Sequence, residues 1–303
     1  MNILVLGSTG FLGSDFINYC NDMSDINCFF SVRDCDFLEC KNSNNIVPLS
    51  VLLDKGRAMD WLKTHAIDVL ISFLGLAHSK NDDFEHCLDS NYSINRKIFF
   101  NAELASVKKI IYISSANVYG YGSHLNYFCI SENSPVHPQN NNMRTKVKIE
   151  NYLINELRTE STVGIVLRIP LVYGHGNKAV GNILSLRLLA SRVRFLPFSA
   201  FSVNLKSYLS QALLNDVILN AAVDQNDICT GIYNIADEYA ISTSQFVRTI
   251  TENMKPKVYH LYFPKLFFLI FFKIFGKYPL YHFLNSSFVL DVSKAKKSGL
   301  LRF

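Results

Sequence analysis

The sequence predicts an α/β protein, with a doubly wound parallel sheet over residues 1–175 and a smaller α+β lobe over residues 176–303. Two observations support this prediction. Short runs that are almost entirely apolar alternate with longer helical segments, and a glycine-rich stretch follows the first apolar run directly. Parallel strands are covered by helices on both faces, so they are continuous apolar runs in sequence. The alternation therefore predicts right-handed strand–helix–strand units.

The first part of the chain contains five apolar runs that we interpret as strands. They lie at Asn2–Leu6, Asn27–Val32, Val69–Leu74, Lys109–Ile113 and Val163–Ile169. The segments that separate them include four predicted helices, at Phe11–Asn21, Arg57–Thr64, Tyr92–Ala105 and Lys146–Leu157. This order of elements is what a doubly wound sheet requires.

After about residue 176 the alternation weakens. We expect helices at Asn182–Ser191, Gln211–Ala222 and Ser242–Asn253, and Ser and Thr caps mark the start of the last one. A short strand is predicted at Ile232–Ala236. We assign these elements to the smaller lobe, which would hold the substrate.

The composition excludes several classes of protein. The 303 residues are 49% hydrophobic and 18% charged, which excludes a disordered chain. The net charge of +5 is small and scattered, so we expect no nucleic-acid partner. The seven cysteines form no CxxC pair, and no histidine stands at ligand spacing beside a cysteine pair, so we expect reduced thiols and no metal site. The opening MNILVLG is interpreted as a strand rather than a signal peptide, and we expect a cytoplasmic protein.

The segment Tyr259–Tyr278 is densely aromatic, and lysines stand at its edges. Its apolar core, Leu266–Phe272, is far shorter than the ~20 residues that a membrane span needs. We expect a helix buried against the smaller lobe. The alternative is a helix that lies in a membrane interface and makes peripheral contact through residues 262–276.

The most specific motif is the loop Gly7-Ser8-Thr9-Gly10-Phe11-Leu12-Gly13, between the first strand and the first helix. Gly7 permits a tight turn, Gly10 lets the backbone approach a pyrophosphate, and Gly13 lets the helix pack close to the strand. The helix that starts at Phe11 and Leu12 offers free N–H groups to the phosphates. The loop predicts a Rossmann-type dinucleotide-binding domain over residues 1–175.

The end of the second strand predicts which dinucleotide binds. A basic residue there accommodates the 2′-phosphate of NADP, and an acidic residue bonds the ribose 2′-hydroxyl of NAD. Arg33 comes first and Asp34 follows it. We favour NADP through Arg33, and NAD through Asp34 is the alternative.

Several motifs together resemble the extended short-chain dehydrogenases/reductases, and within them the nucleotide-sugar epimerase/dehydratase/reductase branch. The resemblance covers nearly the whole chain. Asn91 stands at the position of the family's Asn ahead of a central helix. The other matching stretches are the glycine loop, Ser114-Ser115-Ala116-Asn117-Val118-Tyr119-Gly120, Arg168–Gly176 and Asn204-Leu205-Lys206-Ser207.

The resemblance implies an NAD(P)-dependent reductase or epimerase of a nucleoside-diphosphate sugar, similar to enzymes that act on UDP-N-acetylhexosamine derivatives in O-antigen and capsule synthesis. It implies hydride transfer at the sugar C4 or a neighbouring carbon. A homodimer through the helices Tyr92–Ala105 and Lys146–Leu157 is also implied. By the same resemblance, Ser115 orients the reacting oxygen and Lys146 binds the nicotinamide ribose. The remaining contacts implied are Pro170 with the cofactor, and Asn117, Asn182 and Lys206 with the substrate.

One position departs from the family pattern. The family has a Tyr four residues before its Lys, and this chain has Asn142 there. An amide can donate a hydrogen bond but cannot act as a general acid near neutral pH. The chain is then a weakened enzyme that still binds its ligands, or a non-catalytic partner of an active paralogue, or an enzyme with a substitute acid. Candidates for the substitute are Tyr121, His124, Tyr127 and His175.

Overall fold

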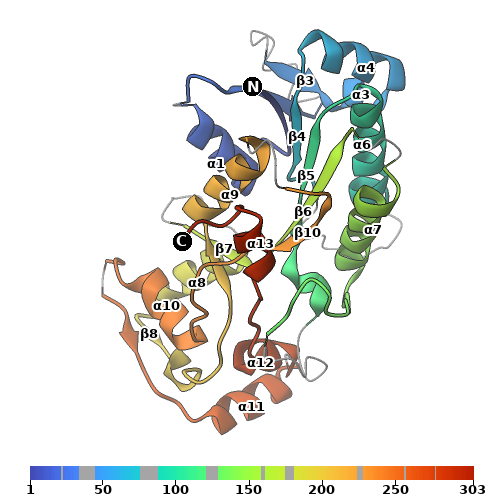
Figure 1. Ribbon diagram of the computed structural model, residues 1–303. Coiled ribbons are helices and arrows are strands. Elements are labelled where there is room, and N and C mark those ends of the chain that lie inside the picture. The colour runs from blue at the N-terminus through green and yellow to red at the C-terminus, as the bar shows by residue number, and fades with distance from the viewer. Residues whose placement is uncertain are drawn as a thin grey trace.

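The computed structural model describes residues 1–21, 23–33, 45–75, 88–120, 129–157, 161–174, 181–223, 228–255, 257–276 and 278–303 (Figure 1). Within these residues a seven-stranded sheet has the order β10-β6-β5-β4-β1-β2-β3, and every neighbouring pair is parallel. The strands span Asn2–Leu6 (β1), Asn27–Val32 (β2), Ile46–Pro48 (β3), Val69–Ser72 (β4), Lys109–Ser115 (β5), Val163–Ile169 (β6) and Gly231–Asn234 (β10). The predicted doubly wound α/β fold is confirmed.

Helices cover both faces of the sheet (Figure 1). One layer consists of α1 (Phe11–Cys20), α9 (Gln211–Val223) and α13 (Ser293–Lys297), and the other of α3 (Leu49–Leu53), α4 (Lys55–Thr64), α6 (Ile94–Leu104) and α7 (Asn141–Asn155). Side chains alternate along each strand, so each strand supplies two cores. Ile3 and Val5 belong to the core under the first layer, and Leu4 and Leu6 to the core under the second.

Several elements of the structure differ from the prediction in their bounds or in the part of the fold to which they belong. The strand predicted at Ile232–Ala236 lies in the main sheet as β10, where Gly231 pairs with Ile165, and not in the smaller lobe to which we assigned it. The physical reason is burial: Tyr233 and Asn234 are both fully covered once β10 extends the sheet beside β6. In addition, β5 continues two residues further than predicted, to Ser115, and α7 begins earlier, at Asn141. The segments 211–223 and 231–234 therefore return to the sheet, so a single boundary near residue 175 does not separate the two halves.

The smaller lobe is built around short elements beyond the carboxyl ends of β5 and β6. It contains α8 (Gly181–Arg192), α10 (Thr243–Thr251), α11 (Lys265–Ile274) and α12 (Tyr278–Asn285). Two parallel two-stranded sheets join it, β7 (Leu171–Tyr173) with β9 (Tyr208–Ser210) and β8 (Phe195–Leu196) with β11 (Tyr259–His260). Ser242 and Gln245 form a capping box at the start of α10, as the predicted caps require.

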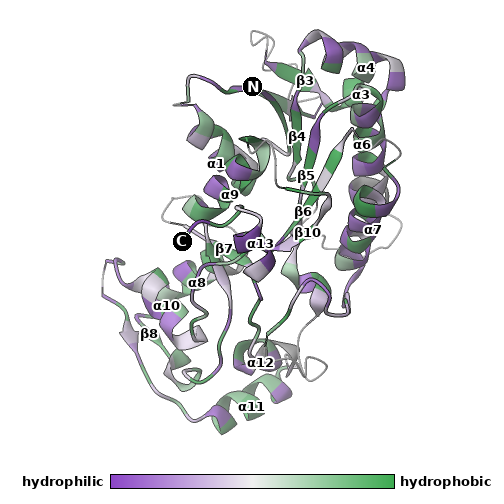
Figure 2. Cartoon of the chain, viewed as in Figure 1, coloured by the Kyte–Doolittle hydropathy of each residue, from purple (hydrophilic) through white to green (hydrophobic). Residues whose placement is uncertain are grey.

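The aromatic segment forms the helix α11, and the expectation that this helix is buried is wrong. Among its side chains only Phe268 is buried. Phe268 and Phe272 pack into a cluster with Phe201 and Tyr281, and Figure 2 shows that the ribbon of α11 is mainly hydrophobic. No helix in the described part of the chain is long and apolar enough to cross a membrane.

Candidate active site

The strand order places a topological switch point at β1. The chain passes from β1 to β2 on one side and later returns to β4 on the other. Open α/β sheets bind ligands in the crevice beyond the carboxyl ends of the strands at such a point. The residues that follow β1, β4, β5 and β6 all lie at this edge, and they include Gly7, Gly75, the strand-terminal Ser115 and the buried Pro170.

The glycine loop is packed so closely that larger residues cannot replace its glycines. Gly7 has φ +76°, and a Cβ there would lie 3.1 Å from the carbonyl carbon of Phe73. A Cβ on Gly10 would lie 3.2 Å from the carbonyl oxygen of Gly7, and one on Gly13 would overlap the same oxygen. The Ser8 hydroxyl donates a 2.8 Å hydrogen bond to the carbonyl of Ser31, which ties the loop to β2. This geometry fits the predicted dinucleotide cradle.

The first turn of α1 is open to an anion. Gly10 is the N-cap, no side chain caps the helix, and the first turn carries no acidic residue. Phe11 and Leu12, predicted as cofactor contacts, begin the helix beside this cradle. The N–H groups of a first turn have no partner within the helix, and the helix dipole adds partial positive charge there. A pyrophosphate group therefore fits this position.

The two serines at the end of β5 point in different directions, as strand alternation predicts. The buried Ser114 hydroxyl donates to Glu150 on α7. Ser115 is half-buried, and its hydroxyl oxygen accepts a 3.2 Å hydrogen bond from the backbone N–H of Asn117. That bond occupies one lone pair of Ser115 and leaves its O–H able to donate. Ser115 and Asn117 thus lie together at the sheet edge, where both were predicted.

Lys146 reaches the same edge from α7. Its Nζ lies 3.3 Å from the carbonyl oxygen of Ile113 and 3.4 Å from the hydroxyl of Tyr112. A Cβ placed on Gly75, in the loop after β4, would lie 3.6 Å from that Nζ. Burial lowers the pKa of Lys146 to about 8, and the negative charge of Glu150 opposes this shift. The ammonium therefore stands at the crevice between β4 and β5.

Asn142, at the position where the resemblance predicts a Tyr, is held in place by an amide pair. Its Oδ1 accepts a 3.0 Å hydrogen bond from Nδ2 of Asn91, and both residues are buried. The side chain lies one helical turn before Lys146, so both residues face the same side of α7. The site can orient a polar group at this point, but Asn142 itself provides no titratable proton.

A buried ion pair that we did not predict fixes α7 to the sheet. The guanidinium of Arg168 on β6 contacts the carboxylate of Glu150 through Nη2–Oε2 at 2.6 Å, and the two side chains are 4% and 1% exposed. The ring of Tyr119 lies 4.7 Å from the Arg168 guanidinium carbon. A basic residue inside an apolar strand, and an acid four residues after Lys146, were the signals for this pair. It holds Lys146 and Ser115 in register.

Lys206, predicted to bind the substrate diphosphate, is buried in the smaller lobe. Its ammonium donates to the carbonyl of Phe283 on α12 and lies 3.9 Å from the centre of that ring. Burial lowers the pKa of Lys206 to about 8. A diphosphate would have to displace this contact, so the assignment stays a prediction.

Other predicted residues are less informative. Arg33 follows β2 and is exposed, at the side of the crevice where a 2′-substituent is expected. Asn182 lies at the start of α8, and only its backbone is described. The remaining candidates lie outside the described residues, and they are Asp34, Tyr121, His124, Tyr127 and His175.

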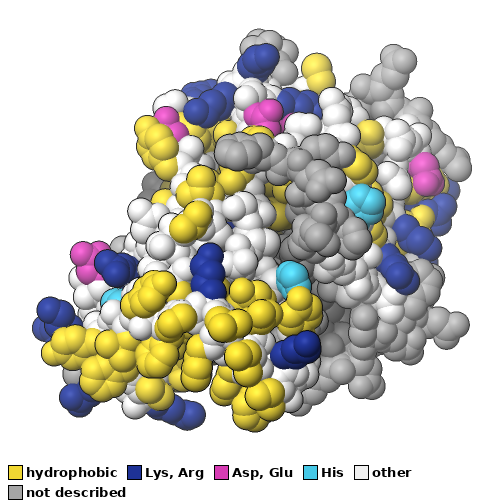
Figure 3. All heavy atoms as spheres, turned by 90° about the horizontal axis from the view of Figure 1, so that it is seen from below, with side chains coloured by type: hydrophobic (Ala, Val, Ile, Leu, Met, Phe, Trp, Pro, Cys, Tyr) yellow, Lys and Arg dark blue, Asp and Glu magenta, His cyan; other side chains and the backbone are white. Residues whose placement is uncertain are grey.

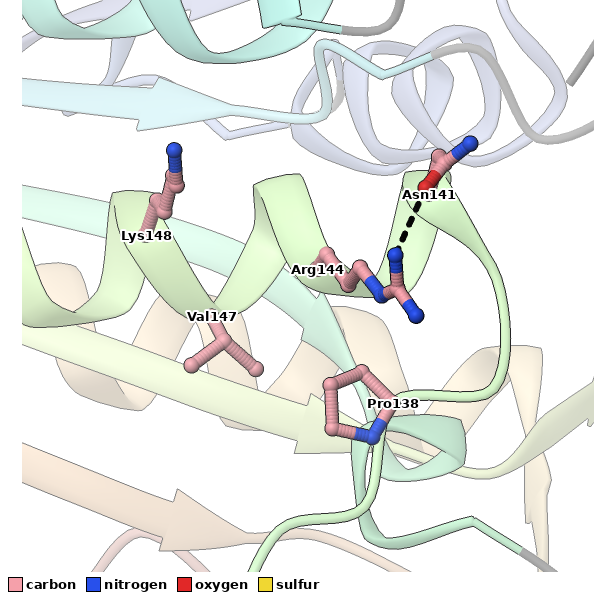
Figure 4. Close-up of a pocket in the computed structure, with 5 residues that line it drawn as sticks. All are labelled: Pro138, Asn141, Arg144, Val147 and Lys148. Carbon is pink, nitrogen blue, oxygen red and sulfur yellow. Dashed lines mark hydrogen bonds between the residues drawn. The ribbon is translucent and has the colours of Figure 1, made fainter. Parts of the chain in front are cut away.

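A separate open pocket of about 570 Å³ lies against α7 (Figure 4). Its lining includes Pro138, Asn141, Arg144 and Lys148, and Arg144 donates a 3.3 Å hydrogen bond back to Asn141. Helical periodicity places these positions on a different side of α7 from Asn142 and Lys146. The pocket is therefore not part of the crevice at the sheet edge.

Two relatives with established activities resemble the chain along most of its length. A UDP-glucose 4-epimerase of Vibrio cholerae is 26% identical over 302 residues, which cover 98% of this chain and 89% of that protein. The N-acetyl-alpha-D-glucosaminyl-diphospho-ditrans,octacis-undecaprenol 4-epimerase of Escherichia coli O157:H7 is 23% identical over 271 residues, 87% of this chain and 75% of that protein.

Solved structures show the same fold. The UDP-Glc/GlcNAc 4-epimerase of Campylobacter jejuni matches with a TM-score of 0.71 at 15% identity, over 98% of this chain and 92% of that one. The UDP-glucuronic acid 4-epimerase of Bacillus cereus, solved with NAD, also matches with a TM-score of 0.71 at 15% identity, over 98% and 90%. The model of the NAD dependent epimerase/dehydratase family matches residues 3–193. Together with the glycine cradle and the crevice at the sheet edge, this match shows that the chain belongs to the NAD dependent epimerase/dehydratase family.

Proposed function

We propose that this protein is an NAD(P)-dependent 4-epimerase of a hexose carried on a diphosphate, with a UDP-N-acetylhexosamine derivative as substrate, in surface polysaccharide synthesis. The observation that carries the proposal is the convergence of the glycine cradle, Ser115 and Lys146 on one sheet edge at the switch point. Both established relatives are 4-epimerases of diphosphate-linked sugars.

Different residues of the chain would bind the cofactor and orient the substrate. The backbone between Gly7 and Gly13 would hold the pyrophosphate of the dinucleotide, and Lys146 would hold its ribose. A bound nicotinamide supplies the hydride acceptor and donor. Ser115 keeps its O–H available and would donate it to the sugar oxygen at the reacting carbon.

Asn142 limits the proton transfer that accompanies hydride transfer. A missing general acid costs about 10²–10⁴-fold in rate, so we expect turnover to be slow. A second candidate function follows from the same residue: a dinucleotide-binding partner of an active paralogue, with no turnover of its own.

Asn142→Tyr distinguishes these functions. The protein is incubated with NAD and either UDP-glucose or UDP-N-acetylglucosamine, and the C4 epimer is followed by NMR. Slow epimerisation that rises about 10²–10⁴-fold in Asn142→Tyr supports the weakened epimerase. Binding without turnover in the native chain supports the partner function, and rapid native turnover supports a substitute acid. Net loss of NADPH absorbance with a 4-keto sugar would instead identify a reductase.

The choice of dinucleotide depends on the end of β2. We propose that Arg33 meets the 2′-phosphate of NADP. Arg33→Ala should then weaken NADPH binding about tenfold and leave NADH binding nearly unchanged, because one charge-assisted contact is lost. Calorimetric titration with both cofactors tests this proposal, and equal loss for both, or none, would favour NAD through Asp34.

We also propose a cytoplasmic homodimer. Cys20, Cys28, Cys129 and Cys229 are free thiols, which is typical of a reducing compartment. The outer faces of α6 and α7 are the surface that the family resemblance assigns to the dimer. Light scattering of the purified chain tests the dimer, and a monomer at micromolar concentration would reject it.

A further inference from the structure

The helix α11 presents an apolar face that the described residues leave uncovered. Five side chains on one side of the helix are between 44% and 73% exposed: Leu266, Phe267, Ile270, Phe271 and Ile274. Their spacing of three and four residues makes them one continuous stripe, which we call the α11 face. Exposed apolar stripes of this kind mark interaction surfaces.

The opposite side of the same helix is held firmly by the smaller lobe. Phe268 is 6% exposed, and its ring lies 5.0 Å from that of Phe201 in an edge-to-face contact. Phe272 packs into the same cluster. A helix that is apolar on all sides occurs in a protein core or against lipid. The inner side of α11 packs on the core of the smaller lobe. The α11 face has no such core among the described residues, so it requires a second apolar environment.

The charged side chains in the segment that carries the α11 face have one sign. Residues 253–290 contain no Asp or Glu. The same stretch contains five lysines, Lys255, Lys257, Lys265, Lys273 and Lys277. Figure 3 shows hydrophobic side chains gathered over the lower part of the molecule, with Lys and Arg at the margin of the band. An apolar face whose own segment of the chain carries only cations complements an anionic membrane surface.

We propose that the α11 face docks this protein on the surface of a bilayer that contains anionic lipids. Ten residues of helix span about 15 Å, half the thickness of the ~30 Å hydrocarbon core, so α11 would lie in the plane of the interface. The exposed Tyr262 would lie at headgroup level, and Lys265 and Lys273 would place their ammonium groups among the lipid phosphates. The crevice would then be held near diphosphate-linked sugars carried on membrane lipids.

A second copy of the chain is a poorer occupant for the same surface. A two-fold interface places the same patch of both subunits in contact. The lysines of one copy would then face those of the other, and residues 253–290 offer no carboxylate to pair with them. Like charges across an interface oppose association.

Vesicle flotation tests the proposal with the full chain. The probes are vesicles of phosphatidylcholine alone, and of phosphatidylcholine with phosphatidylglycerol. We expect the native protein to float with the anionic vesicles, and Ile270→Ser to bind them about tenfold more weakly, because one inserted apolar side chain is lost. Lys265→Gln and Lys273→Gln should each weaken binding to anionic vesicles about fivefold and leave the neutral vesicles unaffected.

Val223→Ser is the matched control. Val223 ends α9 and is 51% exposed, and Ile270 is 50% exposed, so the two substitutions remove similar exposed apolar groups from helices in different places. Absence of native binding to both vesicle types, or equal binding by Ile270→Ser and Val223→Ser, would overturn the proposal. A native dimer that Ile270→Ser turns into a monomer, without vesicle binding, would show that a second copy covers the face. Ile270→Ser should keep its activity on a soluble UDP-sugar, so failure here is distinguishable from failure of the proposed epimerase function.

Discussion

The sheet-centred half and the smaller lobe use apolar helices in opposite ways. In the first, Ile98, Phe99 and Ala102 of α6 are fully buried against the strands. In the second, α11 is richer in Phe and Leu but buries Phe268 alone. The difference teaches that apolar content does not decide burial, because burial depends on how many neighbouring elements the fold supplies. A helix on a seven-stranded sheet has a complete partner surface, and α11 has only one aromatic cluster beneath it.

The two halves also differ in the partners that their buried cationic side chains have. The sheet-centred half pairs its buried Arg168 with Glu150, across α7 and β6. The buried Lys206 in the smaller lobe has a backbone carbonyl and an aromatic ring as partners instead of a carboxylate. The first arrangement pairs two buried charges, and the second leaves a buried ammonium without a carboxylate partner among the described residues.

The largest expected effect is on the glycine cradle. Gly10→Asp should weaken dinucleotide binding more than about 100-fold, because a carboxylate would face the pyrophosphate and the Cβ would press on the carbonyl of Gly7. Fluorescence titration with NADH and NADPH measures the loss, and circular dichroism checks that the fold is kept. Unchanged titration would show that the cradle is elsewhere.

The next effect concerns the ion pair that anchors α7. Glu150→Gln should reduce the free energy of unfolding by about 3–5 kcal/mol, because the Arg168 charge stays buried without compensation. Glu156→Gln, at the exposed C-cap of the same helix, should change it by less than about 0.5 kcal/mol. Urea unfolding compares the two variants. Equal midpoints would mean that the pair contributes nothing to the rigidity of the sheet-centred half.

A pair of substitutions on α11 tests its two sides directly. Phe268→Ala should reduce the free energy of unfolding by about 3 kcal/mol, since it leaves a cavity under Phe201. Ile270→Ala, on the α11 face, should change it by less than about 0.5 kcal/mol. Chemical unfolding of both variants makes the comparison. If Ile270→Ala destabilised the chain as much as Phe268→Ala, the α11 face would be buried in solution.

The smallest expected effect is a pH dependence that both halves share. The pKa of Lys146 and the pKa of Lys206 are each lowered by burial from 10.5 to about 8. At these two sites the unfolded chain therefore binds more protons than the folded chain between pH 8 and pH 10.5, and the contribution of the two lysines to stability rises with pH in this interval. Each lysine contributes at most about 3 kcal/mol to the rise. Lys146→Met and Lys206→Met should each flatten part of the curve, and a curve that is unchanged in either variant would show that its ammonium is solvated.

Much of the fold was predictable from local pattern. The strands Asn2–Leu6, Asn27–Val32 and Val163–Ile169 have the predicted bounds. They were predictable because a strand covered on both faces is a nearly continuous apolar run. The three-residue strands β3, β7 and β9 were not predicted, since they are too short to show a periodicity.

The candidate site was predictable where a motif demands particular residues. Gly13 leaves no room for a Cβ, Gly7 and Gly10 leave very little, and Ser115 and Lys146 follow from their spacing within matching motifs. The partners of these residues were not predictable. Asn91 lies 51 positions before Asn142 and bonds to it, and nothing local in either segment indicates that contact.

The amino-acid sequence was enough to predict the strand–helix alternation and the glycine cradle, and it places Asn at position 142. These features depend on the identity of one residue or on spacing along one element. The folded structure was needed to show that β10 joins the main sheet, that Glu150 meets Arg168, and that α11 exposes five of its apolar side chains. Each of these depends on which distant segments come to lie side by side, and the energy of burial or pairing arises only after they meet.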